Sequence, residues 1–78
     1  MRPDRRVIFG ASRPSDPMGL RVFRSRGDAG NGELRRLLAA IAAGGVNLAI
    51  IDTRRNGHSG VRAVVIACRR HRVQYLYR

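Results

Sequence analysis

The chain has 78 residues, of which 44% are apolar and only 5% aromatic, so the composition predicts a single small domain, residues 1–78, with an aliphatic core. A domain of this size buries only about 60% of the surface that its unfolded chain exposes, which leaves a small margin of stability. The formal net charge of +11 comes from sixteen arginines against five acidic residues, with no lysine. So large a positive charge attracts polyanions, of which nucleic acid is the commonest.

The exclusive use of arginine has two explanations. A guanidinium group can grip a phosphate through two parallel hydrogen bonds, which would favour arginine at phosphate-binding positions. GC-rich coding also raises Arg, Ala and Gly together, and all three are abundant here. GC-rich coding does not by itself reduce the acidic residues to five, so the net positive charge still indicates an anionic partner.

Membrane and secretory classes are disfavoured. No apolar run approaches the ~20 residues that span a bilayer. The first residues, Met1–Arg6, lead into only a short apolar run and do not resemble a secretory signal. The lone Cys68 cannot form an internal disulfide, and no CxxC spacing suggests a metal site. We therefore expect a cytoplasmic protein.

Apolar periodicity predicts strands and helices in the order β-β-α-β-α-β. The expected strands are Val7–Phe9, Leu20–Arg26, Asn47–Thr53 and Val73–Tyr77, and the expected helices run from Glu33 to the glycines 44 and 45 and from about Ser59 to Arg70. The segment Ala11–Gly19 is expected to be an irregular loop because it holds two prolines and two serines. The third strand is apolar on both faces, which is typical of an interior strand in a parallel sheet.

Both helices carry an apolar stripe. In the first, Leu34, Leu37, Leu38 and Ile41 repeat at helical spacing. In the second, the core stripe is joined by Ala63, Ile66 and Ala67, so its apolar arc is wider than one sheet face would cover. We therefore expect a second side of this helix to be covered by the first helix or by a partner.

These elements predict a small, mainly parallel α/β fold with both helices on one face of the sheet. That placement follows from right-handed crossovers if strands two, three and four are neighbours in sequence order. The other face would be open, and would present Arg21, Phe23, Ala49, Ile51, Gln74, Leu76 and Arg78. A mixed apolar and basic face of this kind favours contact with another molecule, so we expect a homo-oligomer or a larger protein assembly.

The carboxyl ends of parallel strands meet at one edge of a sheet, where open α/β sheets bind their ligands. Here that edge collects basic and polar side chains, together with the amino end of the second helix, whose backbone N–H groups favour anions. The candidate phosphate-binding or nucleic-acid-binding residues are Arg26, Arg54, Arg55, His58, Ser59 and Arg78. The alternative is that these arginines are solvated loop ends whose positions simply follow from the high arginine content.

Catalysis, a metal and a cofactor are not indicated. Asp52, His58 and Ser59 would lie near one strand end, but adjacent residues such as His58 and Ser59 rarely aim their side chains at each other. Asn56 or Ser59 is expected to cap the second helix instead. His71 lies in a basic turn at the opposite edge of the sheet and has no second ligand at helical spacing.

Two further motifs have both a functional and a structural interpretation. The turn Gly27–Gly32 lies between a strand and a helix, where a glycine-rich backbone can surround a phosphate, but it matches neither the Walker nor the GxGxxG pattern and is more simply a flexible connector. Tyr75 and Tyr77 point to the same face of the last strand, where they could stack on bases. Because helices should cover that face, we expect core or edge packing instead.

The segment Gly45–Arg78 resembles a family of small bacterial Rossmann-like domains with no assigned activity. In that family an apolar strand ends in Thr, a short loop reaches a His that opens a basic helix, and a final strand closes the domain. The matching parts are Ile50–Thr53, His58–Ser59, Val61–Arg72 and Val73–Tyr77. The resemblance implies a Rossmann-like fold, although the family places a helix after the first strand where this chain has Ala11–Gly19.

Three functions remain in view. The sequence favours a basic α/β module that binds DNA or RNA through phosphates, without reading sequence, as part of an assembly. The second possibility is a nucleotide or phosphoester site at the same edge, with or without hydrolysis. The third is a module that assembles with other proteins through its open sheet face.

Overall fold

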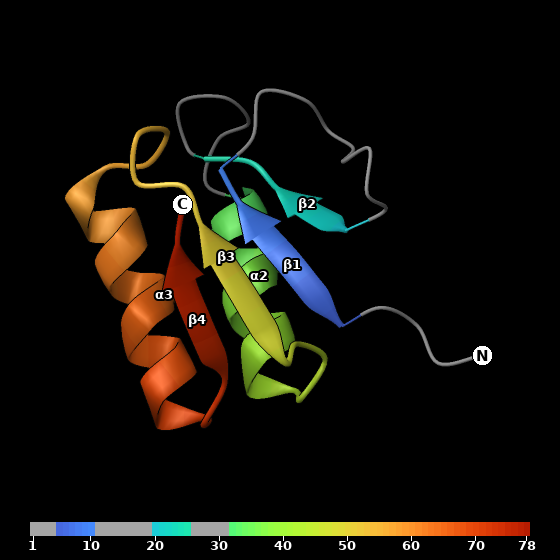
Figure 1. The fold of residues 1–78 in the computed structure, drawn as a ribbon. Helices are drawn as coiled ribbons and strands as arrows, with labels where there is room; N and C mark the ends of the chain where they lie inside the picture. The colour runs from blue at the N-terminus through green and yellow to red at the C-terminus, as the bar shows by residue number, and fades with distance from the viewer. Residues whose placement is uncertain (1–4, 11–19, 26–31) are drawn as a thin grey trace.

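The computed structural model describes residues 5–10, 20–25 and 32–78, and within them four strands and two helices follow one another in the predicted β-β-α-β-α-β order (Figure 1). The strands are β1 (Arg6–Phe9), β2 (Arg21–Phe23), β3 (Leu48–Ile51) and β4 (Gln74–Tyr77), and the helices are α2 (Gly32–Ala42) and α3 (His58–Arg70). The expected loop 11–19 and most of the glycine-rich turn 27–32 lie outside the described residues.

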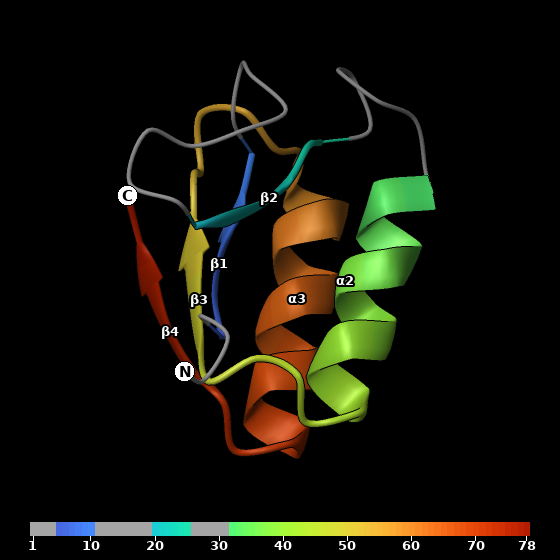
Figure 2. The ribbon, with the colours of Figure 1, turned by 90° about the vertical axis from the view of Figure 1, so that its right-hand side faces the viewer.

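All strand pairs are parallel, and the sheet has the order β2-β1-β3-β4. The predicted adjacency of strands two and three in the sheet is therefore wrong, because β1 lies between β2 and β3. The steps from β2 to β3 and from β3 to β4 still run in the same direction across the sheet. Right-handed crossovers consequently place α2 and α3 on one face, as predicted, and Figure 2 shows both helices on the same side of the sheet.

The core lies between the sheet and the two helices. Its fully or nearly fully buried members are Val7, Phe9, Phe23, Leu37, Ile41, Val46, Ala49, Ile51, Val64 and Cys68. Most of these side chains are aliphatic, as the low aromatic content predicts. Helix α3 also contacts α2, so the prediction that a second side of this helix is covered is confirmed, although Ile66 remains 53% exposed.

The sheet face away from the helices differs from the predicted one. Ala49 pairs with Val7, and both Ile51 and Phe23 pair with Phe9, all of them in the helix-covered core. Their assignment to the open face is therefore wrong. Arg21, which pairs with Val7, belongs to the helix side as well, and its guanidinium lies 5.3 Å from the centre of the Phe23 ring.

The row on the other face runs across the whole sheet. It consists of the register partners Val22, Ile8, Ile50 and Leu76. Leu76 is 49% exposed, whereas Ile8 is 2% exposed. Because Leu76 is the register partner of Ile50, it lies on this face as predicted, and so does Gln74, two residues before it. The homo-oligomer expected from this face stays a prediction.

No helix within the described residues is long and apolar enough to cross a membrane. The same part of the chain holds no group of three or more side chains that could bind a metal ion.

Candidate functional site

The candidate site lies at the carboxyl edge of the sheet, where β1 and β3 are neighbours. From β1 the chain goes to β2 on one side, and from β3 it goes to β4 on the other, so this is the point at which the strand order reverses. Ligands of open α/β sheets bind at such a point. Backbone hydrogen bonds tie the strand ends together, from Gly10 N to Phe23 O (2.8 Å) and from Asp52 N to Phe9 O (3.0 Å).

Asn56 holds the loop between β3 and α3 against the end of β1. Its Nδ2 donates to Phe9 O (3.1 Å) and to Asp52 O (2.7 Å), so one carboxamide fixes two strand ends. The Oδ1 of the same side chain is buried and has no hydrogen-bond partner among the described residues. Asn56 is thus a brace inside the loop, and the prediction that it caps the helix is wrong.

Gly10 makes this brace possible. It has a φ of +96°, a region that residues with a side chain rarely adopt. A Cβ at this position would overlap Asn56 Nδ2 and would lie 3.3 Å from the Cβ of Arg55. The absence of a side chain at Gly10 therefore lets the β3–α3 loop approach β1.

Helix α3 begins at this edge without a side-chain cap. Its N-cap residue is Gly57, in an extended conformation, which has no side chain to accept a hydrogen bond from the first turn. The predicted cap Ser59 is wrong because the helix starts one residue earlier, which places Ser59 inside the first turn. The N–H groups of a first helical turn carry partial positive charge, and anions are stabilised beside them.

The structure places five of the six predicted site residues at this edge, in the β3–α3 loop, the first turn of α3 and the position after β4, and we call them the edge cluster: Arg54, Arg55, His58, Ser59 and Arg78. All five are exposed. Arg78 joins the loop residues because its backbone N–H donates to Ile51 O (2.8 Å), directly before the loop begins. Arg26, the sixth predicted residue, lies outside the described residues.

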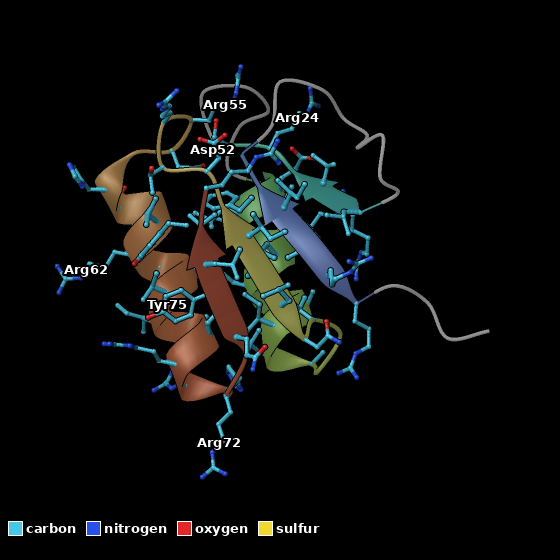
Figure 3. All side chains as sticks on the ribbon, viewed as in Figure 1. Arg24, Asp52, Arg55, Arg62, Arg72 and Tyr75 are labelled. Atoms are coloured by element: carbon cyan, nitrogen blue, oxygen red, sulfur yellow. The ribbon has the colours of Figure 1, made fainter. Side chains whose placement is uncertain are left out.

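One carboxylate belongs to the same loop. Asp52 Oδ1 accepts the backbone N–H of Arg54 (2.9 Å), which closes a tight turn at the start of the loop. Figure 3 shows Asp52 and Arg55 together above the carboxyl end of β3. The carboxylate is therefore bonded within the loop backbone, and it partly offsets the charge of the arginines that follow.

An ion pair next to this site was not predicted from the sequence. Glu33 Oε2 accepts the backbone N–H of Arg24 (2.9 Å) and lies 3.4 Å from Arg24 Nε. The contact joins the end of β2 to the first turn of α2, where an acidic side chain also complements the helix dipole. Because Glu33 balances its charge, we leave Arg24 out of the edge cluster.

Arginine is not confined to this edge. Figure 3 shows Arg62 extending from the outer side of α3, and Arg72 at the end of the molecule opposite Arg55. Arg69 and Arg70 are also exposed, in the last turn of α3. Exposed arginines are therefore spread over the described surface, and Arg54, Arg55 and Arg78 are those that lie at the carboxyl edge, where α3 begins.

The edge cluster suits binding better than chemistry. Asp52 bonds to the loop backbone, and the neighbouring side chains of His58 and Ser59 are both exposed. The thiol of Cys68 is fully buried, and burial raises its pKa, which keeps it in the unreactive protonated form. Guanidinium groups beside a helix amino end are instead a set of donors for phosphate oxygens.

Comparisons with protein-family models, with curated proteins and with solved structures found no match to this chain. The resemblance of Gly45–Arg78 to bacterial Rossmann-like domains therefore stays a prediction.

Proposed function

We propose that the protein is a basic α/β module that binds nucleic-acid phosphates without reading base sequence, through the edge cluster. The observation that supports this proposal most directly is the arrangement of the β3–α3 loop. It carries Arg54 and Arg55, exposed, into a helix start whose N–H groups no side chain caps. Both features favour phosphate, and Arg78 adds a further guanidinium at the same edge.

The net charge supports a polymeric anion over a small one. With +11 on 78 residues, the molecule attracts polyanions over long distances and from several sides. Contact of the three edge-cluster arginines with about three phosphates predicts a log–log salt slope of about −2.7, and hence a loss of roughly fortyfold in affinity between about 50 and about 200 mM salt. Binding of this type depends on the backbone of the nucleic acid and is insensitive to its sequence.

The test is a fluorescence-anisotropy titration of labelled DNA and RNA, single-stranded and duplex, at two salt concentrations. The variant is Arg54→Gln with Arg55→Gln. Its matched control is Arg69→Gln with Arg70→Gln, because this second pair is also adjacent and exposed but lies in the last turn of α3. We expect the first pair to reduce the magnitude of the salt slope by about 2, since each lost phosphate contact removes about 1.

The control pair should leave the slope close to that of the wild type. Absent binding, salt-insensitive binding, or an equal effect of the two pairs would refute the proposal. Saturable binding of a mononucleotide in the absence of polymer binding would favour a nucleotide or phosphoester site at the same edge.

A further inference from the structure

Two tyrosines on β4 have different surroundings. Tyr75 is half-buried and packs against the core, whereas Tyr77 is 59% exposed. Their ring centres lie 6.0 Å apart and the rings are inclined by 71°, which is an edge-to-face contact. Core packing therefore accounts for Tyr75, whereas Tyr77 is an exposed residue that core packing does not explain.

The exposed ring lies at the same edge as the phosphate-binding residues. Tyr77 pairs with Ile51, whose side chain is fully buried on the helix side of the sheet. Tyr77 therefore faces the side on which α3 lies, at the strand end where α3 begins. The next residue is Arg78, which is bonded through its backbone to the end of β3.

We propose that Tyr77 is a stacking platform for an unpaired base, so that the edge cluster prefers single-stranded nucleic acid over duplex. This inference rests on the proposed function. Bases within a duplex are already stacked and paired, whereas an unpaired base can place its face on an aromatic side chain. Arg78 and the arginines of the β3–α3 loop would hold the adjoining phosphates.

The contact with Tyr75 prepares the ring for this role. An edge-to-face contact restrains the orientation of Tyr77 before a ligand arrives, so less freedom is lost on binding. Because β4 is the last strand of the sheet, no further strand in the described part of the chain lies against its outer edge. A single strand can therefore approach Tyr77 from beyond the sheet.

The first test compares affinities for oligothymidine or oligouridine with those for a duplex of equal length. Tyr77→Ala should weaken single-strand binding on the order of tenfold and leave duplex binding unchanged. Tyr77→Phe should retain the wild-type affinity because it keeps the ring. Leu76→Ala is the matched control, since Leu76 is 49% exposed but lies on the opposite face of β4, and it should have no effect.

The second test observes the ring directly. The chain has two tyrosines and no tryptophan, so in Tyr75→Phe the only tyrosine emission comes from Tyr77. Oligothymidine should quench that emission by stacking, whereas inorganic polyphosphate, which offers phosphates without bases, should bind and leave it unchanged.

The outcomes separate this inference from the proposed function. If neither single-stranded nor duplex nucleic acid binds, the stacking inference and the proposed function are both refuted. Binding of single strands and duplexes with equal affinity, without quenching and without an effect of Tyr77→Ala, would overturn stacking alone and leave phosphate binding in place. Equal weakening of both nucleic acids by Tyr77→Ala would also overturn it, because a structural defect would explain the loss.

Discussion

The brace between Gly10 and Asn56 predicts a strong energetic coupling between two residues far apart in the sequence. In Gly10→Ala, the new methyl group must displace the Asn56 carboxamide, which then loses its hydrogen bonds to Phe9 O and Asp52 O. Each such bond contributes about 1 kcal/mol net, so their loss costs about 2 kcal/mol. The positive φ of Gly10 adds about 1 kcal/mol for a residue with a Cβ, which gives about 3 kcal/mol in total.

A double-mutant cycle measures the coupling. Asn56→Ala alone should cost about 2 kcal/mol, because the same two hydrogen bonds are lost. In the Asn56→Ala background the carboxamide is absent, and Gly10→Ala should then cost only the backbone strain of about 1 kcal/mol. The interaction energy of the cycle is therefore expected to be about 2 kcal/mol in magnitude, within the range seen for residues in contact.

Urea unfolding followed by far-UV circular dichroism gives the free energies. A domain of this length has a total stability of about 4 to 12 kcal/mol, so the single variants should still fold. Gly44→Ala is the control, because Gly44 also has a positive φ, +80°, but in the described part of the chain no neighbouring atom lies within 4 Å of the position that a Cβ would occupy. It should cost about 1 kcal/mol in either background. If Gly10→Ala costs no more than Gly44→Ala, or costs the same with and without Asn56, the brace does not hold the loop.

The remaining predictions concern the core. Leu37→Ala should lower the free energy of unfolding by about 2 to 5 kcal/mol, because Leu37 is fully buried. Ile66→Ala, at a position 53% exposed, should change it by no more than about 0.5 kcal/mol. Equal effects of the two variants in urea unfolding would contradict the core assignment. Burial raises the pKa of the Cys68 thiol, so the unfolded chain loses this proton at a lower pH than the folded one. Relative to Cys68→Ala, the wild type should therefore keep its full stability below the ordinary thiol pKa of 9.0 and lose stability as the pH rises above it. Unfolding at about pH 8 and about pH 10 checks this, and a difference that stays constant or grows would contradict it.

The elements were predictable because their local signals agree. The repeat of Leu34, Leu37 and Ile41 and the glycines after residue 43 define α2, and the apolar run before Asp52 defines β3. The order of the strands in the sheet, and the face of the sheet to which each side chain points, were not predictable in the same way. Leu48–Ile51 is apolar at every position, so alternation cannot tell which half of its side chains meets the helices. The position of β1 between β2 and β3 depends on pairing between distant segments, for which the chain carries no local signal.

The candidate site was predictable in its chemistry and not in its construction. Arg54, Arg55 and His58 follow an apolar strand, and this order is enough to place them at the carboxyl edge. The brace could not be inferred, because Asn56 bonds to the carbonyl of Phe9, 47 residues away. An asparagine just before a helix is more often a cap. Only the structure shows that this carboxamide donates hydrogen bonds to Phe9 O and Asp52 O at the ends of β1 and β3. As a consequence, Asn56 does not cap α3.

The central position of β1 also affects how this chain acquires its fold. Both neighbours of β1 follow it in the chain, and one of them, Leu48–Ile51, is synthesised much later than Val7–Phe9. Until then an apolar strand has an unsatisfied edge, and pairing between such distant segments is intrinsically slow. The emerging chain is therefore most exposed to aggregation before β3 is synthesised, and the positive charge of Arg5 and Arg6, immediately before Val7 in β1, opposes contact between incomplete copies.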